Sequence, residues 1–171
     1  MMSAILSDVL FAAIAGLGFA YVARPPFRTL LISAILAGIG YGFRTILVEV
    51  YHLQMLAFAT FLASFLVGCL ALLSSKYLKT PSEIISFPAL LPMIPGVYAY
   101  KTILFLIAFL DNQNENEAAR SLYLKDFFEH FFTTLSVTAA LAVGASSALL
   151  LFVEQSFKLT RYSNKLFKKF K

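Results

Sequence analysis

Arg44 and Lys101 are two basic residues that lie inside long apolar stretches of this sequence. A charged side chain at the centre of a bilayer costs about 2.5–3.5 kcal/mol on insertion scales, so cations there usually serve a function. Their chemistry is electrostatic, because both attract carboxylates and the arginine fork can bind one through two hydrogen bonds. Tyr98 and Tyr100 lie beside Lys101 and carry hydroxyl groups that can donate to the same ligand. We therefore predict that these four residues contribute to a site for a small anion.

Each of these side chains also has a simpler interpretation. Arg44 stands about two turns from the end of its apolar stretch, so it can instead extend to the surface or pair with Glu49. Lys101 lies further from the end of its apolar stretch, so extension to the surface is a weaker explanation for it. The rings of Tyr98 and Tyr100 can simply pack, and both interpretations stay open at this stage.

Residues 87–101 are apolar enough for a membrane but contain three prolines and a glycine. Each proline removes a backbone donor and clashes with the carbonyl four residues earlier, which disfavours an unbroken helix. The freed carbonyls need partners in protein or in a water-filled cavity. A half-helix that starts after Pro95 and Gly96 would aim its positive end at the membrane centre and attract anions. We predict a broken helix that lines a pathway, and Pro92, Pro95 and Gly96 join the candidate site.

Composition indicates an integral membrane protein, since 60% of the 171 residues are hydrophobic and only 13% are charged. A spanning helix needs about 20 mostly apolar residues. The sequence therefore predicts an all-α polytopic membrane protein with about five transmembrane helices, the fourth broken at the Pro/Gly motif. The expected spans are residues 5–23, 29–50, 56–77, 83–110 and 127–153, the last preceded by an amphipathic approach. We divide the chain into a transmembrane domain, residues 1–156, and a basic tail, residues 157–171.

Loop charges predict the orientation of the spans, because positive residues concentrate on the cytoplasmic side. The second and fourth loops hold only Arg120 and Lys125, beside several acids. The first and third loops and the tail hold the others: Arg24, Arg28, Lys76, Lys79, Lys158, Arg161, Lys165, Lys168, Lys169 and Lys171. We expect the N-terminus outside and the C-terminus in the cytoplasm. The basic tail then lies at the lipid bilayer surface, so the net charge of +5 indicates no nucleic-acid partner.

Residues for covalent, metal or cofactor chemistry are sparse. Cys69 is the single cysteine and falls inside an apolar run, where it is most simply a small buried residue. His52 and His130 have no metal-site spacing, and no nucleophilic triad or phosphate loop is visible. We predict no enzyme activity, no catalytic residue, no metal and no cofactor. No basic residue precedes the first apolar run, so we expect no cleaved signal peptide.

Small residues recur every fourth position in four of the expected helices, which lets helix backbones approach closely. These stripes either pack the chain's own helices or form an interface with a partner. The stripes are Ala12, Gly16, Ala20; Ala34, Gly38, Gly42; Thr60, Ser64, Gly68; and Ser136, Ala140, Gly144, Ala148. Hydroxyl groups in the last helix, from Thr133 to Thr138, are expected to bond to their own helix backbone.

Two motifs resemble the threonine/serine exporter family, specifically its small-subunit type, which is equivalent to the C-terminal half of fused exporters. They are residues 38–44, with three glycines and Arg44, and residues 88–96, with three prolines and Gly96. Residues 18–20 and 66–68 add support, and the resemblance covers most of the chain.

The resemblance implies a subunit of a secondary active exporter in the bacterial inner membrane, coupled to the proton-motive force. The cargo would be threonine or serine, or a dicarboxylate such as succinate, and all of these carry carboxylates that suit the two cations. The resemblance also implies a partner, a larger membrane subunit that carries the N-terminal half. The alternative is a structural or accessory membrane subunit without its own substrate site.

Overall fold

The computed structural model describes residues 2–51, 55–111 and 117–167, and every regular element in these ranges is a helix. The elements are α1 (Met2–Val22), α2 (Phe27–Glu49), α3 (Leu56–Leu78), α4 (Ser82–Leu90), the 3₁₀ turn η1 (Leu91–Met93), α5 (Gly96–Asp111) and α6 (Glu117–Phe167). The all-α prediction is confirmed. The predictions for His52 and for most of the acidic loop fall outside the described residues.

The number of membrane spans also agrees with the sequence. Four helices, α1, α2, α3 and α6, are long and apolar enough to cross a bilayer. The segment from Ser82 to Met93 and the helix from Gly96 to Asp111 form a bent pair that makes a fifth candidate span. The chain is therefore a multi-pass α-helical membrane protein with a broken fourth span.

Helix α6 differs from the sequence prediction, which separated an amphipathic approach, a span and a tail. It is one continuous helix of 51 residues, about 76 Å long at 1.5 Å per residue, whereas the hydrocarbon core of a bilayer is about 30 Å thick. No proline interrupts residues 117–167, so nothing in the local sequence stops the helix. The division at residue 157 falls inside α6 and stays a prediction.

The small-residue stripes pack the helices of this chain against one another. A Cβ atom at Gly16 of α1 would lie 2.5 Å from the Cβ of Ala37 on α2, and one at Gly68 of α3 would lie 2.7 Å from that of Ala148 on α6. Such distances leave no room for a larger residue, so the backbones of these pairs are in close approach. The stripes therefore pack the chain's own helices at these positions.

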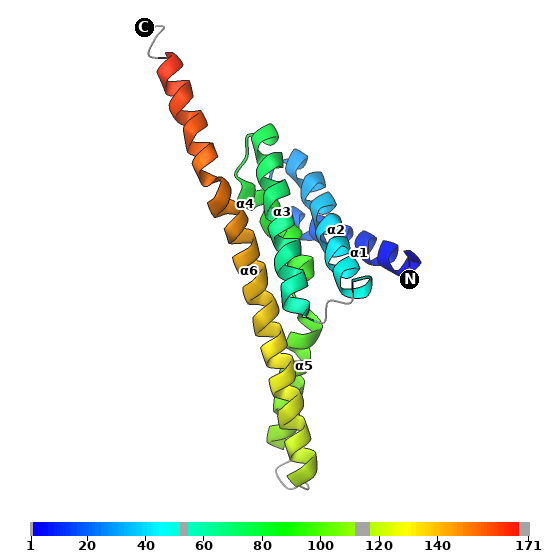
Figure 1. Cartoon of the computed structure of the whole chain (residues 1–171). Helices are drawn as coiled ribbons and strands as arrows, with labels where there is room; N and C mark the ends of the chain where they lie inside the picture. Colours follow the sequence, from blue (N-terminus) through cyan, green and yellow to red (C-terminus); the bar gives the residue numbers. More distant parts are fainter. Residues whose placement is uncertain (1, 52–54, 112–116, 168–171) are drawn as a thin grey trace.

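Helix α4 and η1 lie against α1, α2 and α3, and the buried core gathers around Ile85, Ala89 and Met93. Helix α5 instead packs chiefly against the first part of α6. Figure 1 shows this α5–α6 pair extending past the ends of α2 and α3. We call α1, α2, α3, α4 and η1 the bundle, and α5 with residues 117–133 of α6 the hairpin.

Candidate functional site

The broken span has its break where the sequence indicates. The α4–η1 segment and α5 meet at an angle of 52°. Between them Ile94 has an extended backbone, with φ −62° and ψ 131°, and Pro95 is buried. Pro88 lies inside α4 without ending it. The interruption therefore falls at residues 94–96, where Pro95 has no N–H to donate.

Arg44 reaches this break from α2. Its Nη1 donates a hydrogen bond of 2.8 Å to the carbonyl oxygen of Met93, and its guanidinium carbon lies 4.5 Å from the centre of the Tyr41 ring. The carbonyl of Met93 precedes the bend, so it cannot continue the helical hydrogen-bond pattern into α5. Arg44 thus provides the partner that a freed carbonyl needs inside a membrane protein.

This arrangement differs from both simple interpretations of Arg44. The side chain is directed to Met93 and Tyr41 rather than to the surface or to Glu49, which is exposed near the end of α2. The bond to Met93 uses one of the five N–H donors of the guanidinium group. The break therefore has a fixed positive charge beside it.

The glycine-and-arginine motif of α2 lies against α1, α3 and η1. Cβ atoms at Gly38 and Gly42 would meet Val9 of α1. A Cβ at Gly40 would collide with Val67 of α3 and would lie 2.5 Å from the methyl carbon of Met93. Because residues four apart share a helix face, the Gly40 and Arg44 pair faces η1.

A cavity of about 230 Å³ lies beside the break, between α1, α2 and η1. Its polar lining residues are Asp8 of α1 and Tyr41 of α2, and Pro92 closes it from η1. Tyr41 is the residue whose ring Arg44 covers. Pro92, a predicted site residue, thus lies in a cavity that also contains a carboxylate.

The sequence interpretation missed Asp8, although the pattern contains a signal for it. Asp8 stands four residues before Ala12, so it continues the stripe of Ala12, Gly16 and Ala20 by one more step. That stripe faces α2, and residues at this spacing share a helix face. A carboxylate on it is therefore directed towards α2 rather than towards lipid.

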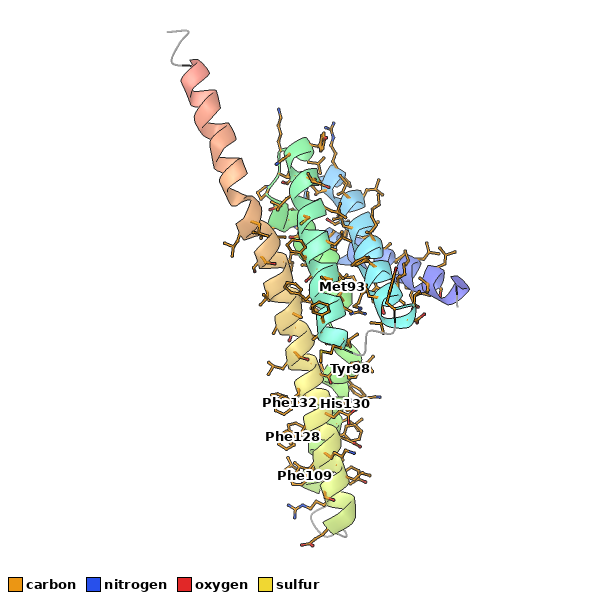
Figure 2. All side chains as sticks on the ribbon, viewed as in Figure 1. Met93, Tyr98, Phe109, Phe128, His130 and Phe132 are labelled. Carbon is orange, nitrogen blue, oxygen red and sulfur yellow. The ribbon has the colours of Figure 1, made fainter. Side chains whose placement is uncertain are left out.

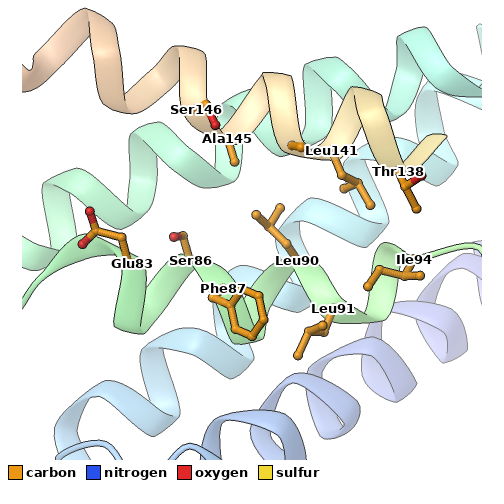
Figure 3. A pocket seen from close by; sticks show the side chains of 11 residues that line it. Glu83, Ser86, Phe87, Leu90, Leu91, Ile94, Thr138, Leu141, Ala145 and Ser146 are labelled. Carbon is orange, nitrogen blue, oxygen red and sulfur yellow. The ribbon is translucent and has the colours of Figure 1, made fainter. Parts of the chain in front are cut away.

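A second cavity, of about 340 Å³, lies on the other side of the broken span, between α4–η1 and α6. Figure 3 shows Glu83 and Ser86 near one end and Ile94 near the other, with Thr138 and Ser146 on the opposite wall. Ser86 is only 7% exposed, and its hydroxyl has no hydrogen-bond partner among the described residues. The lining is otherwise apolar.

The candidates on α5 are not brought together with Arg44. Lys101 and Tyr100 are exposed, and no hydrogen bond joins either of them to Arg44 in the described part of the chain. Tyr98 lies on the other side of the break, with its ring centre 5.5 Å from that of His130. Gly96 is exposed, and a Cβ there would meet no atom within 4 Å. The predicted site is thus divided between the bundle and the hairpin.

His130 contacts two rings of α5, since it also stacks on Phe105 at 5.4 Å. Its Nδ1 atom is buried without a hydrogen-bond partner. Within the described ranges, no group of three or more His, Cys, Asp and Glu residues is placed to hold a metal ion.

The hydroxyl groups of α6 bond to their own helix, as predicted. Thr133 and Thr134 donate to the carbonyls four residues earlier, and Ser136 donates to that of Thr133. Thr138 donates to Thr134 at 2.7 Å. These hydroxyl groups are therefore bonded to their own helix backbone rather than directed to a ligand.

Comparison with known proteins places this architecture in a family. The model of the family described as "Threonine/Serine exporter, ThrE" matches residues 8–151. An uncharacterized protein of Haemophilus influenzae is 35% identical over 153 residues, which are 88% of this chain and 48% of that protein. The chain thus spans about half the length of this relative, and no solved structure matches it. Because the family match extends over most of the chain, including the Arg44 motif and the helix break, the chain belongs to the threonine/serine exporter family.

Proposed function

We propose that this chain is one subunit of a secondary active exporter of small carboxylate-bearing metabolites, coupled to the proton-motive force. The cargo is threonine or serine, or a dicarboxylate such as succinate. Family membership supports export. The observation that carries the anion preference is the contact between Arg44 and the carbonyl of Met93, because it holds a cation at the helix break.

Interrupted helices in many secondary transporters form the cargo site near the middle of the membrane. Here the guanidinium group of Arg44 has further donors available to a carboxylate after it has bound Met93. Helix α5 begins at Gly96, and the N-terminus of a helix carries a partial positive charge. Arg44 and the start of α5 therefore supply positive potential from the two sides of the break.

The second part of the proposal is a partner subunit. The chain matches about half of its relative from Haemophilus influenzae, which supports a larger membrane protein that supplies the other half. We place the N-terminus outside and the C-terminus in the cytoplasm of a bacterial inner membrane, on the strength of the loop charges. Two halves of opposite orientation would then enclose the break, as in transporters with inverted repeats.

Transport into everted membrane vesicles tests this function. Vesicles are prepared from cells that make this chain alone, the larger subunit alone, or both. They are energised to form a proton gradient and offered radiolabelled threonine, serine or succinate. We expect uptake only with both subunits, and a protonophore should abolish it.

The alternative outcomes are distinct. Uptake that needs the larger subunit but not this chain would favour an accessory role. Full uptake by this chain alone, in reconstituted liposomes, would contradict the two-subunit proposal. Uptake that persists without a proton gradient would contradict the coupling.

A further inference from the structure

The cavity beside the helix break contains a carboxylate that the proposed function does not use. Asp8 is the single charged residue in its lining, which also includes Tyr41 and Pro92. No hydrogen bond or ion pair to Asp8 occurs within the described residues. A carboxylate inside a span is costly and usually marks a functional site. An unpaired carboxylate in the lining of a cavity can attract a cation.

The position of Asp8 in α1 argues against a purely structural role. An acidic residue near the N-terminus of a helix interacts favourably with the helix dipole, but that effect falls off within the first turn. Helix α1 begins at Met2, so Asp8 lies in its second turn. The stripe that begins with Ala12 directs this face of α1 towards α2 rather than towards solvent.

The opposite charge lies against the ring of the same tyrosine. Tyr41 lines the cavity, and the guanidinium carbon of Arg44 is 4.5 Å from its ring centre. The cavity therefore has a negative group on the α1 side, and a positive group packs against the tyrosine on its α2 side. This arrangement complements a molecule with both an ammonium and a carboxylate group. A dicarboxylate would bring a second negative charge towards Asp8, which disfavours it.

We propose that Asp8 binds the ammonium group of a zwitterionic amino acid in this cavity. The proposal rests on the exporter function and narrows its cargo to amino acids. Asp8 then acts as a specificity-determining residue, because it favours an amino acid over a dicarboxylate of similar size.

Cysteine labelling tests the site without relying on transport. The single native cysteine is removed as Cys69→Ala, and Ala15→Cys then places a thiol in the wall of the cavity. Vesicles that contain both subunits are treated with a cationic or an anionic methanethiosulfonate reagent. Gly18→Cys is the matched control on α1, because its Cβ meets no atom within 4 Å and lies outside the cavity.

We expect the cationic reagent to modify Ala15→Cys about tenfold faster than the anionic reagent, because Asp8 concentrates cations in the cavity. Asp8→Asn should remove this preference. Threonine and ethanolamine, which share an ammonium group, should slow the modification, whereas succinate should not. A preference that survives Asp8→Asn, or equal protection by succinate and threonine, would overturn the proposal.

Transport then separates this proposal from the exporter function. Asp8→Asn should raise the KM for threonine by about tenfold or more, as expected for the loss of a charged hydrogen-bond partner. Glu49→Gln removes an exposed carboxylate elsewhere and should leave the KM unchanged. Unaltered threonine transport by Asp8→Asn would refute the ammonium site but leave the exporter intact. Labelling as expected in vesicles that transport neither amino acids nor succinate would refute the exporter but leave the site intact.

Discussion

The bundle and the hairpin differ in their residue types and in how many of their side chains are buried. In the bundle, Gly and Ala let helices approach closely, and Ala37, Ala63 and Val67 are fully buried. In the hairpin, none of the residues of α5 is buried. Figure 2 shows Phe128 and Phe132 on the outer side of α6, where they are 46% and 59% exposed. The bundle therefore has a buried core, whereas the described residues of α5 contribute none.

The helix break lies at the junction of these two regions, and the predicted site is divided there. Arg44, Asp8 and Pro92 belong to the packed side. Tyr98, Tyr100 and Lys101 belong to the unpacked side. The break therefore lies between a region with buried side chains and a helix without them.

The largest expected effect compares a glycine of the bundle with a glycine at the junction. Gly40→Leu should prevent stable folding, because even a Cβ there collides with Val67 and Met93, and overpacking of this kind costs about 1–3 kcal/mol or more. Gly96→Leu should insert and fold at normal levels, since a Cβ there meets open space. Heating in detergent followed by size-exclusion chromatography measures both.

Transport assays add a second measurement for the variant at Gly96. We expect Gly96→Leu to abolish transport despite normal folding, because we propose that the cargo passes the exposed break. Normal transport by this variant would show that the unpacked side of the break is not part of the route. Equal thermal stability of the two variants would show that the bundle is less tightly packed than described.

A smaller effect is expected from Arg44, which binds the last residue of η1 on the bundle side of the break. Arg44→Gln should reduce transport more than Arg44→Lys, because the positive charge attracts the carboxylate of the cargo. The guanidinium group additionally allows two parallel hydrogen bonds to that carboxylate. Both variants should lower the free energy of unfolding by about 1–3 kcal/mol if the carbonyl of Met93 loses its donor. Transport is measured by vesicle uptake at matched protein levels, and stability is measured by thermal unfolding in detergent. Equal uptake by both variants would leave Arg44 as a structural residue only.

The smallest expected effect compares two serines. Ser64 lies at the contact between α3 and α6. Its hydroxyl donates to the carbonyl of Phe61 at 3.0 Å and to that of Ala140 at 3.3 Å. Ser64→Ala should destabilise the protein by about 0.6 kcal/mol, which is the average for such bonds in membrane proteins. Ser86→Ala should leave stability unchanged, because its hydroxyl has no partner among the described residues. A larger loss for Ser86→Ala than for Ser64→Ala, measured by thermal unfolding, would contradict the difference between the packed contact and the cavity.

Reporter fusions test the orientation of the chain in the membrane. A reporter that is active only outside the cytoplasm should be active when it is inserted in the loop between α5 and α6. It should be silent when fused after Lys171, because the tail is strongly basic. The reverse pattern would show that the hairpin points into the cytoplasm.

The sequence alone determined the features that depend on local chemistry. Hydropathy located the spans because each needs a continuous apolar length. Pro95 located the break because it lacks a backbone donor. The spacing of Gly16, Gly68 and Ala148 identified close-packing faces, although spacing by itself does not say which helix packs on which face.

Tertiary structure decided the contacts between residues that are distant in the sequence. The carbonyl of Met93 stands 49 residues from Arg44, and only the packing of η1 on α2 brings them together. The tertiary structure also places Asp8 in the lining of a cavity, because residues of α1, α2 and η1 together form that cavity. Helix α6 runs continuously past residue 127 because it packs first on α5 and then on α3. Local patterns determine where helices begin and break and which faces carry small residues, whereas the placement of Arg44 and Asp8 beside the break depends on how the helices pack.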